Sequence, residues 1–352
     1  MQTISPPLVV EGAVIDLGTS LFKILLMLRD QYRLLEHPAY INKLNWDLYQ
    51  RAINSLDDRT NAIWLGEEGY LIGRQAATDY GRLPIWIKKT EAATAKVLSC
   101  LGQIRGSVAW GGRLHIEQLV VLLPYVEMVE KEQVIKAIEK GLEKFEFNGN
   151  KPFITVDRLQ IQWEGFGITS LSKEEQAAFV VFGQKDLTVG ALSRGQLVNP
   201  MPETYVGLGM NQVIERVDYR FQTHVRAALA IFKYRQNPRN LKHFVPGDQL
   251  EVVAKSIDRA IDNTWFDQEQ RLEGTPAVRD AVVLYVLGGS SVIWAPQLKA
   301  FCQSHGKKYQ PLTQVIKDIA VKIPALARNP MLYRITDAYL TLKWLDESRS
   351  VV

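Results

Sequence analysis

The sequence predicts an α/β fold made of two related α/β domains. Short apolar segments on either side of a glycine turn are typical of a β-hairpin, and they occur at Leu8–Leu28 and again at Ala177–Val198. Helical segments follow each hairpin, and a chain of 352 residues is long enough for about two domains. The two hairpins coincide when Gly18 is aligned with Gly183, which indicates an internal duplication with one hairpin in each half.

The first half alternates strand-like and helical segments after its hairpin. Lys131–Lys144 is the clearest helix, because apolar residues recur four positions apart among Glu and Lys. Asn148-Gly149 stands between strand-like residues in Phe145–Val156 and predicts a further hairpin. The other predicted elements are a strand entering a helix at Glu67–Thr78, a helix at Glu91–Leu101, and either the end of a helix or a strand at Arg113–Leu123.

The second half is mainly helical after its hairpin. We expect helices within Asn211–Lys242 and Leu250–Arg271, a buried strand at Ala281–Leu287 and an amphipathic helix at Asp337–Glu347. No low-complexity linker separates the halves, so we expect the domains to pack closely with a cleft between them.

Composition and charge exclude several classes of protein. The chain is 47% hydrophobic and 23% charged, which excludes a disordered or collagen-like protein. A net charge of +4 is too weak by itself to indicate nucleic-acid binding, which would also need a clustered basic face, so we expect no direct nucleic-acid binding. Cys100 and Cys302 form neither a disulfide framework nor a zinc spacing. The most apolar segment, Ala281–Ala295, is shorter than the ~20 residues of a spanning helix, and the N-terminus lacks the basic segment of a secretory signal. We therefore expect a cytoplasmic protein without a membrane span.

The clearest candidate site is Asp16-Leu17-Gly18-Thr19-Ser20, followed by Lys23. The turn offers backbone N–H groups and hydroxyls to a phosphate, and Lys23 adds a positive charge. Asp16, at the strand end, could hold Mg²⁺ through water, because Mg²⁺ binds a few carboxylates together with phosphates. Alternatively, the segment is a plain hairpin in which Asp16 caps the turn.

A second candidate is Leu287-Gly288-Gly289-Ser290-Ser291, where a buried strand runs into two glycines and a helix begins. Glycine lets a ligand approach the backbone closely, and the start of a helix presents N–H groups to an anion. Alternatively, this is a simple strand-to-helix turn.

The order of these features resembles the actin-like ATPase superfamily, and within it the ParM-type (StbA-like) bacterial actins. The resemblance covers nearly the whole chain, although the usual final glycine of the family corresponds to Ala338. It implies the actin-like (ribonuclease H-like) fold, with two related α/β domains, residues 1–168 plus 330–352 and residues 169–329, flanking a nucleotide cleft. Further segments that resemble the family are Leu122–Glu127, Glu164–Gly167, Tyr205–Gly209 and Asn329–Tyr339.

The resemblance also implies a role for each matching residue. Asp16 would organise Mg²⁺, and Glu164 would position the attacking water, as a carboxylate can in phosphoryl transfer; alternatively, Glu164 is a surface turn residue. The residues implied to bind the nucleotide are Gly18, Thr19, Ser20 and Lys23 in the first phosphate loop, Gly183 and Lys185 in the second, Gly207 and Gly209 on the base or ribose side, and Gly288, Gly289 and Ser290 near the nucleoside or its α-phosphate.

One position departs from the family pattern. The second phosphate loop of the family has an Asp before its first glycine, whereas this chain has Val181. Valine can neither bind a metal ion nor activate water, although Asp186 or Thr188 could substitute if the loop shifts. We therefore expect nucleotide binding with slow hydrolysis.

The resemblance implies a filament-forming protein that polymerises with ATP or GTP and Mg²⁺, acts as a weak nucleoside triphosphatase, and serves plasmid segregation or a cytoskeletal scaffold. An open filament requires head-to-tail contacts that do not close into a ring. The implied partners are further copies of the chain and a small DNA-binding adaptor (ParR-like). The basic stretch Arg226–His243 is either a solvated helix face or a contact in the filament or with the adaptor.

Two other functions stay open. A small-molecule kinase of the same superfamily would need a general-base Asp, and Val181 removes the natural candidate. A nucleotide-independent interaction protein is the other alternative, but the intact hairpin at Asp16–Ser20 and turn at Leu287–Ser291 argue against it.

Overall fold

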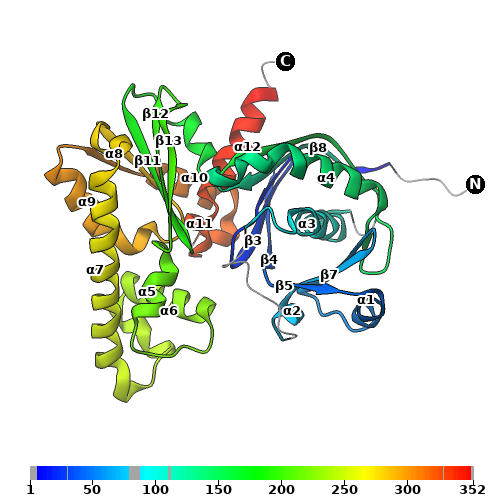
Figure 1. Ribbon diagram of the computed structural model, residues 1–352, viewed down its shortest axis with the longest axis horizontal. Coiled ribbons are helices and arrows are strands. Elements are labelled where there is room, and N and C mark those ends of the chain that lie inside the picture. Colours follow the sequence, from blue (N-terminus) through cyan, green and yellow to red (C-terminus); the bar gives the residue numbers. More distant parts are fainter. Residues whose placement is uncertain (1–5, 30, 79–87, 110–111, 328, 350–352) are drawn as a thin grey trace, which may run out of the picture. The chain divides into compact units, whose positions relative to one another are not determined.

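The computed structural model describes residues 6–29, 31–78, 88–109, 112–327 and 329–349, and the chain forms two compact units (Figure 1). The first unit comprises residues 1–166 and 338–352, and the second comprises residues 167–337. The domain boundaries expected from the sequence lie after residues 168 and 329, and they stay a prediction. The first five residues, part of the N-terminus expected to lack a secretory signal, lie outside the described residues. None of the helices in the described ranges is long and apolar enough to cross a membrane.

The first unit is built on a mixed sheet that, in the described residues, has six strands in the order β1-β8-β2-β3-β4, with β10 also paired to β8. Neighbours β2, β3 and β4 run antiparallel, whereas β2 and β10 each run parallel to β8. The strands are β1 (Leu8–Val10), β2 (Gly12–Asp16), β3 (Leu21–Leu28), β4 (Gln31–Pro38), β8 (Leu114–Leu123) and β10 (Ile154–Trp163). The segment Arg113–Leu123, for which the sequence left helix or strand open, is thus a strand.

Helices cover this sheet because each presents an apolar surface to it. Helix α4 (Lys131–Lys144) has the predicted limits and buries Val134 and Ile138 in the core of the unit. Helix α3 (Ala93–Val108) is buried along most of its length. A smaller sheet packs in the same unit, formed by β5 (Ile41–Leu44), β6 (Thr60–Leu65), β7 (Glu68–Gly73) and β9 (Glu146–Phe147) with helices α1 (Trp46–Ile53) and α2 (Arg74–Thr78).

The last helix, α12 (Thr336–Arg349), belongs to the first unit from Ala338 onward. It lies directly on β2, since a Cβ atom added to Gly12 would be 2.9 Å from Leu342 Cδ1. Near its end, Arg349 forms ion pairs of 3.2 Å with Glu11 and 2.7 Å with Glu117. The first unit is therefore completed by a segment from the far end of the chain.

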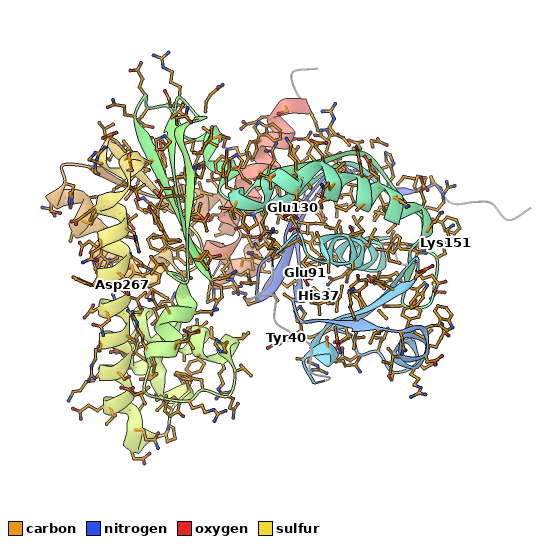
Figure 2. The ribbon with its side chains drawn as sticks, viewed as in Figure 1. His37, Tyr40, Glu91, Glu130, Lys151 and Asp267 are labelled. Atoms are coloured by element: carbon orange, nitrogen blue, oxygen red, sulfur yellow. The ribbon has the colours of Figure 1, made fainter. Side chains whose placement is uncertain are left out.

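The second unit has, in the part of the chain described, a five-stranded sheet in the order β13-β12-β11-β14-β15. Its strands are β11 (Ala177–Phe182), β12 (Asp186–Ser193), β13 (Gln196–Val206), β14 (Val283–Leu287) and β15 (Lys308–Pro311). The helices include α5 (Met210–Arg216), α6 (His224–Gln236), α7 (Leu250–Gly274), α8 (Pro276–Arg279), α9 (Ala295–Ser304), α10 (Thr313–Lys322) and α11 (Met331–Arg334). Helix α5 is joined to α7 by a 2.7 Å ion pair between Arg216 and Asp267, the latter labelled in Figure 2.

Both units use the same strand order and directions. The path β4-β3-β2-β8-β10 of the first unit matches β13-β12-β11-β14-β15 of the second, with two antiparallel pairings followed by two parallel ones. The register matches as well: Asp16 pairs across the strands with Lys23, and Val181 pairs with Thr188. The prediction of two related α/β halves is confirmed.

The predicted hairpin around Asn148-Gly149 is only half right. Asn148 and Gly149 have φ values of 50° and 77°, and hydrogen bonds of 2.8 and 3.0 Å between Phe147 and Asn150 close a tight turn. The strand after the turn, however, does not pair with the strand before it. Pro152 cannot donate a hydrogen bond to a ladder, β9 pairs with β6, and β10 joins β8 in parallel.

Candidate functional site

Asp16 and Lys23 form a buried ion pair in the first unit. Asp16 ends β2, and Lys23 lies opposite it on β3, so the hairpin register brings the two side chains together. Their side chains are only 12% and 10% exposed. The turn between them holds Gly18, and a Cβ atom at Gly18 would be 3.2 Å from Lys23 Nζ. The predicted turn and the predicted lysine therefore lie against each other.

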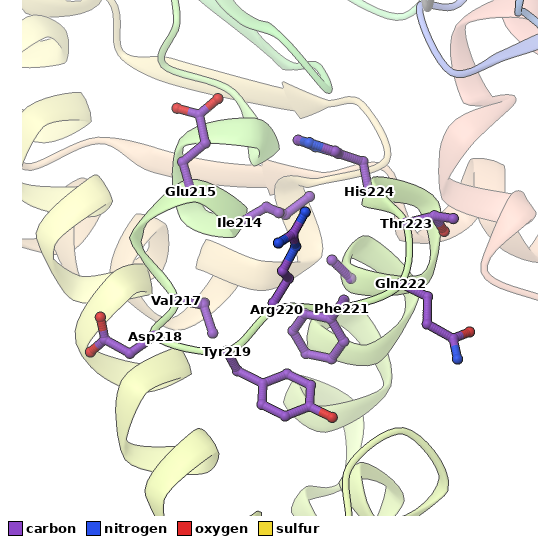
Figure 3. Close-up of a pocket in the computed structure, with 11 residues that line it drawn as sticks. Ile214, Glu215, Val217, Asp218, Tyr219, Arg220, Phe221, Gln222, Thr223 and His224 are labelled. Atoms are coloured by element: carbon purple, nitrogen blue, oxygen red, sulfur yellow. The ribbon is translucent and has the colours of Figure 1, made fainter. Parts of the chain in front are cut away.

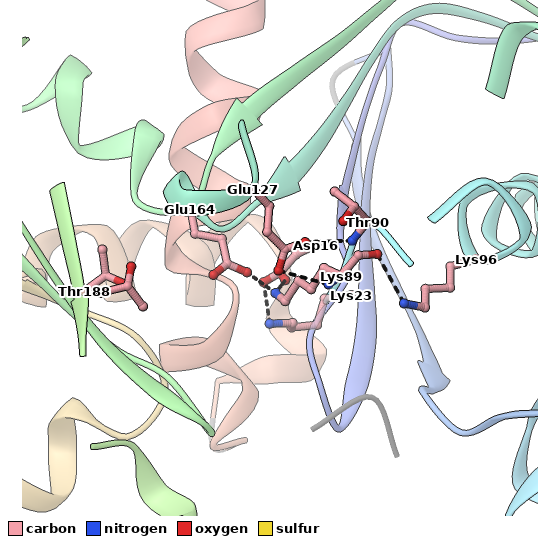
Figure 4. Close-up of polar contacts among 9 residues, drawn as sticks. Asp16, Lys23, Lys89, Thr90, Lys96, Glu127, Glu164 and Thr188 are labelled. Carbon is pink, nitrogen blue, oxygen red and sulfur yellow. Dashed lines mark hydrogen bonds and ion pairs between the residues drawn. The ribbon is translucent and has the colours of Figure 1, made fainter. Parts of the chain in front are cut away.

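Glu164 joins this pair from another part of the chain. It follows β10, and its backbone N–H donates to the carbonyl of Leu123 at 2.8 Å. Its carboxylate accepts a hydrogen bond from Lys89, whose Nζ lies 3.8 Å from Asp16 Oδ1 (Figure 4). The first unit thus gathers Asp16, Lys23 and Glu164, all predicted from the sequence, around Lys89, which was not.

The backbone around Lys89 is held by two buried charged side chains. The carboxylate of Glu127 accepts the N–H groups of Lys89 and Thr90 at 3.0 and 2.7 Å. The ammonium of Lys96, on α3, donates to the carbonyls of Lys89 and Glu91 at 3.2 and 2.7 Å. Because a buried charge is costly unless it is hydrogen-bonded, these four bonds are what makes the two charges tolerable in the core.

The surroundings shift the pKa values of these groups. Burial lowers the pKa of Lys96 to about 8. Burial alone would also lower the pKa of Lys89, but the carboxylates of Glu164 and Asp16 outweigh it and raise that pKa. Burial raises the pKa of the Glu164 carboxyl, against the opposite effect of the Lys89 ammonium.

Sequence reasoning missed Lys89, Glu127 and Lys96 as members of this cluster. Glu127 lies in Leu122–Glu127, a segment already matched to the family, so its place there was a usable signal. The two lysines carried no such signal, because Lys89 stands beside another lysine, Lys88, and Lys96 belongs to no motif in its helix.

In the second unit, the turn after β11 is tied to the start of helix α5. The carbonyls of Gly183, Gln184 and Lys185 accept N–H groups from Met210, Asn211 and Gly209 at 3.2, 2.8 and 3.0 Å. Three N–H groups at the beginning of α5 are therefore satisfied by this turn. This turn therefore brings together three predicted site residues from separate parts of the sequence, Gly183, Lys185 and Gly209.

The turn after β14 lies against the same segment. Gly288 has φ +89°, and a Cβ atom there would be 2.3 Å from the carbonyl oxygen of Phe182, so glycine is needed. A Cβ atom at Gly289 would be 2.4 Å from the side chain of Arg334. The hydroxyl of Ser290 donates to the carbonyl of Gly183 at 3.1 Å. The two predicted glycine turns are thus neighbours in the second unit.

The polar residues considered as substitutes for Val181 have other partners. The Asp186 carboxylate accepts the N–H of Gly207 at 3.2 Å and holds that predicted glycine at the end of β13. The Thr188 hydroxyl bonds to the hydroxyl of Thr204 at 3.1 Å. Val181 itself lies within β11, between Thr188 and Leu287 on the neighbouring strands. Both polar side chains therefore connect β12 to a neighbouring segment, Thr188 to β13 and Asp186 to the glycine that follows β13.

A pocket of about 600 Å³ lies elsewhere in the second unit, along the segment that joins α5 to α6 (Figure 3). Its walls combine apolar side chains such as Ile214, Val217 and Phe221 with the charged Glu215 and Arg220. None of the predicted site residues lines it.

The side chains around Asp16 do not fit a Mg²⁺ ion. Asp16 Oδ2 accepts from Lys23, and the ammonium of Lys89 lies near Oδ1 and binds Glu164. A divalent cation held by Asp16, directly or through one water, would stand next to two ammonium groups that repel it. Within the described ranges, no group of three or more His, Cys, Asp or Glu side chains is placed to hold a metal ion.

Comparison with known proteins identifies the fold. No family model and no curated protein matches the chain. Solved structures do: the Alp12 filament, 14% identical over 96% of this chain and 99% of that chain, has a TM-score of 0.60. ParM of Bacillus thuringiensis with ATP, 13% identical over 96% and 98%, has a TM-score of 0.59. An archaeal actin homologue, 12% identical over 96% and 99%, has a TM-score of 0.58. Over nearly its whole length, this chain has the actin-like fold.

Proposed function

We propose that this chain is a nucleotide-dependent, filament-forming actin-like protein that binds ATP or GTP. The observation that carries the proposal is the fold, which matches a filament of Alp12 and an ATP complex of ParM over 96% of this chain. The proposal is supported by the two clusters of predicted residues, one in each unit.

In the first unit, the turn at Gly18–Ser20 binds phosphate through its N–H groups and hydroxyls, with the ammonium of Lys23 beside it. Glu164 orients the attacking water. It is suited to this because its backbone N–H donates to the carbonyl of Leu123 and its carboxylate accepts a hydrogen bond from Lys89, so its position is fixed.

The remaining contacts with the nucleotide come from two turns of the second unit, Gly183–Asp186 and Gly288–Ser290. Ser290 binds them to each other, which keeps both backbones at one place. The residues proposed to contact the nucleotide here are Gly183, Lys185, Gly207, Gly209, Gly288, Gly289 and Ser290.

Hydrolysis is slow in this proposal. The position equivalent to Asp16 in the second unit is Val181, which has no group to bind a metal ion or activate water. A filament with slow turnover persists longer, which suits a scaffold as well as plasmid segregation. In the latter role the filament is joined to DNA by a small adaptor (ParR-like).

High-speed pelleting with negative-stain imaging tests the proposal. We expect filaments with ATP or GTP and none without nucleotide. Lys23→Met should abolish nucleotide-dependent pelleting, because it removes a charge at the phosphate turn. Lys43→Met is the matched control, since Lys43 is exposed and paired with Glu68 at the surface. Nucleotide binding without filaments under any condition would refute the filament function.

A further inference from the structure

Lys89 is a cation with a fixed position. Glu127 binds the N–H groups of Lys89 and Thr90, and Lys96 binds the carbonyls of Lys89 and Glu91, so the backbone is held from both directions. Glu127 and Lys96 are 8% and 1% exposed. It costs free energy to bury two charged groups that hold one short backbone segment. This segment places the ammonium group of Lys89 between Glu164 and Asp16.

The charges around this ammonium balance. Lys23 and Lys89 face Asp16 and Glu164, two positive groups against two negative ones. A divalent cation would therefore be drawn by two carboxylates that already have ammonium partners, and would be repelled by both ammonium groups.

An ammonium group has three N–H donors and serves a carboxylate and a phosphate oxygen at the same time. Lys23 already lies against the phosphate turn at Gly18. Both ammonium groups thus lie at Asp16, the residue for which the family resemblance implies a magnesium ion.

We propose that a nucleoside triphosphate binds this site without a divalent cation, because the ammonium groups of Lys89 and Lys23 occupy the role of the metal ion. The inference rests on the proposed nucleotide-binding function and specifies the ligand as the metal-free triphosphate.

Isothermal titration calorimetry with ATP and with GTP, in excess Mg²⁺ and in EDTA, tests this inference on the unmodified protein. We expect dissociation constants in the two buffers that agree within about threefold. Binding that weakens by more than about tenfold in EDTA overturns the inference and leaves the proposed function standing. Absence of binding in both buffers overturns the proposed function, and the inference with it.

Variants of Lys89 make the test specific. In EDTA, Lys89→Met should weaken binding by about tenfold or more, because a charge-assisted contact is lost. Mg²⁺ should restore part of that loss, since one of the two ammonium groups that repel a cation is gone and Glu164 has lost its ammonium partner. Lys89→Arg keeps the charge and should bind more tightly in EDTA than Lys89→Met.

Lys88→Met is the matched control. Lys88 is adjacent in sequence but exposed, and it pairs with Glu130 at 2.8 Å. Its loss should leave binding unchanged in both buffers. Equal behaviour of Lys89→Met and Lys88→Met would refute the role of Lys89.

Discussion

Lys96 shows how a single charged residue is accommodated inside a core. It is 1% exposed on α3, and its ammonium is satisfied by two backbone carbonyls. The cost of its burial is visible in its pKa, which falls from 10.5 to about 8.

This pKa predicts a pH dependence of stability. Between pH 8 and 10.5 the unfolded chain keeps a proton on Lys96 that the folded chain has lost, so the free energy of unfolding rises with pH. Between pH 8 and 10.5, the free energy of unfolding of the parent should rise by about 3 kcal/mol relative to that of Lys96→Met. Urea unfolding of both proteins from pH 7 to 10.5 measures the difference. Lys136→Met, on the exposed face of α4, should show no such trend, and a flat difference for Lys96→Met would contradict the prediction.

Val181 is the residue to which we attribute slow hydrolysis. Val181→Asp restores a carboxylate at the position equivalent to Asp16, and we expect phosphate release to rise by roughly a hundredfold. Val181→Asn is the control, because it has the same shape without the charge. Our explanation fails if the Asp variant turns over nucleotide no faster than the parent, measured by phosphate release with ATP and GTP.

Among the connections between elements, the turn after β14 depends on one backbone conformation. Gly288 has φ +89° and no room for a side chain beside Phe182. Gly288→Ala should therefore lower the free energy of unfolding by about 2–4 kcal/mol. Gly274→Ala, at the end of α7, meets no atom within 4 Å and should change it by less than about 1 kcal/mol. Thermal unfolding compares the two, and equal effects would show that the turn is not constrained in this way.

Elements with strong local patterns were predictable. The limits of α4 follow from its apolar spacing, and both glycine hairpins follow from the short apolar segments on either side of their turns. The turn at Asn148-Gly149 was predictable because Asn-Gly between strand-like residues is typical of a tight turn. The pairing of β10 with β8 was not, because strand partners far apart in sequence are chosen by the sheet as a whole.

For the molecule as a whole, the fold could be predicted because each half shows a glycine hairpin in the sequence and the ordered motifs resemble one family. The candidate site could be predicted in part. Asp16 and Lys23 are joined by a hairpin register that the sequence displays, and Glu164 could be reached through the family resemblance. Lys89 and Lys96 could not, because their roles come from contacts that only the folded unit brings about.

The position of α12 has a consequence for how this protein is made. Residues 338–349 supply Leu342 beside Gly12 and Arg349 for Glu11 and Glu117, all within the first unit. During synthesis on the ribosome, the sheet of the first unit emerges before the second unit but lacks this helix until residues 338–349 have been translated. The second unit, which is continuous in sequence, has all its residues earlier. The order of completion therefore reverses the order of synthesis, and the early sheet must stay soluble while its own closing helix is still being made.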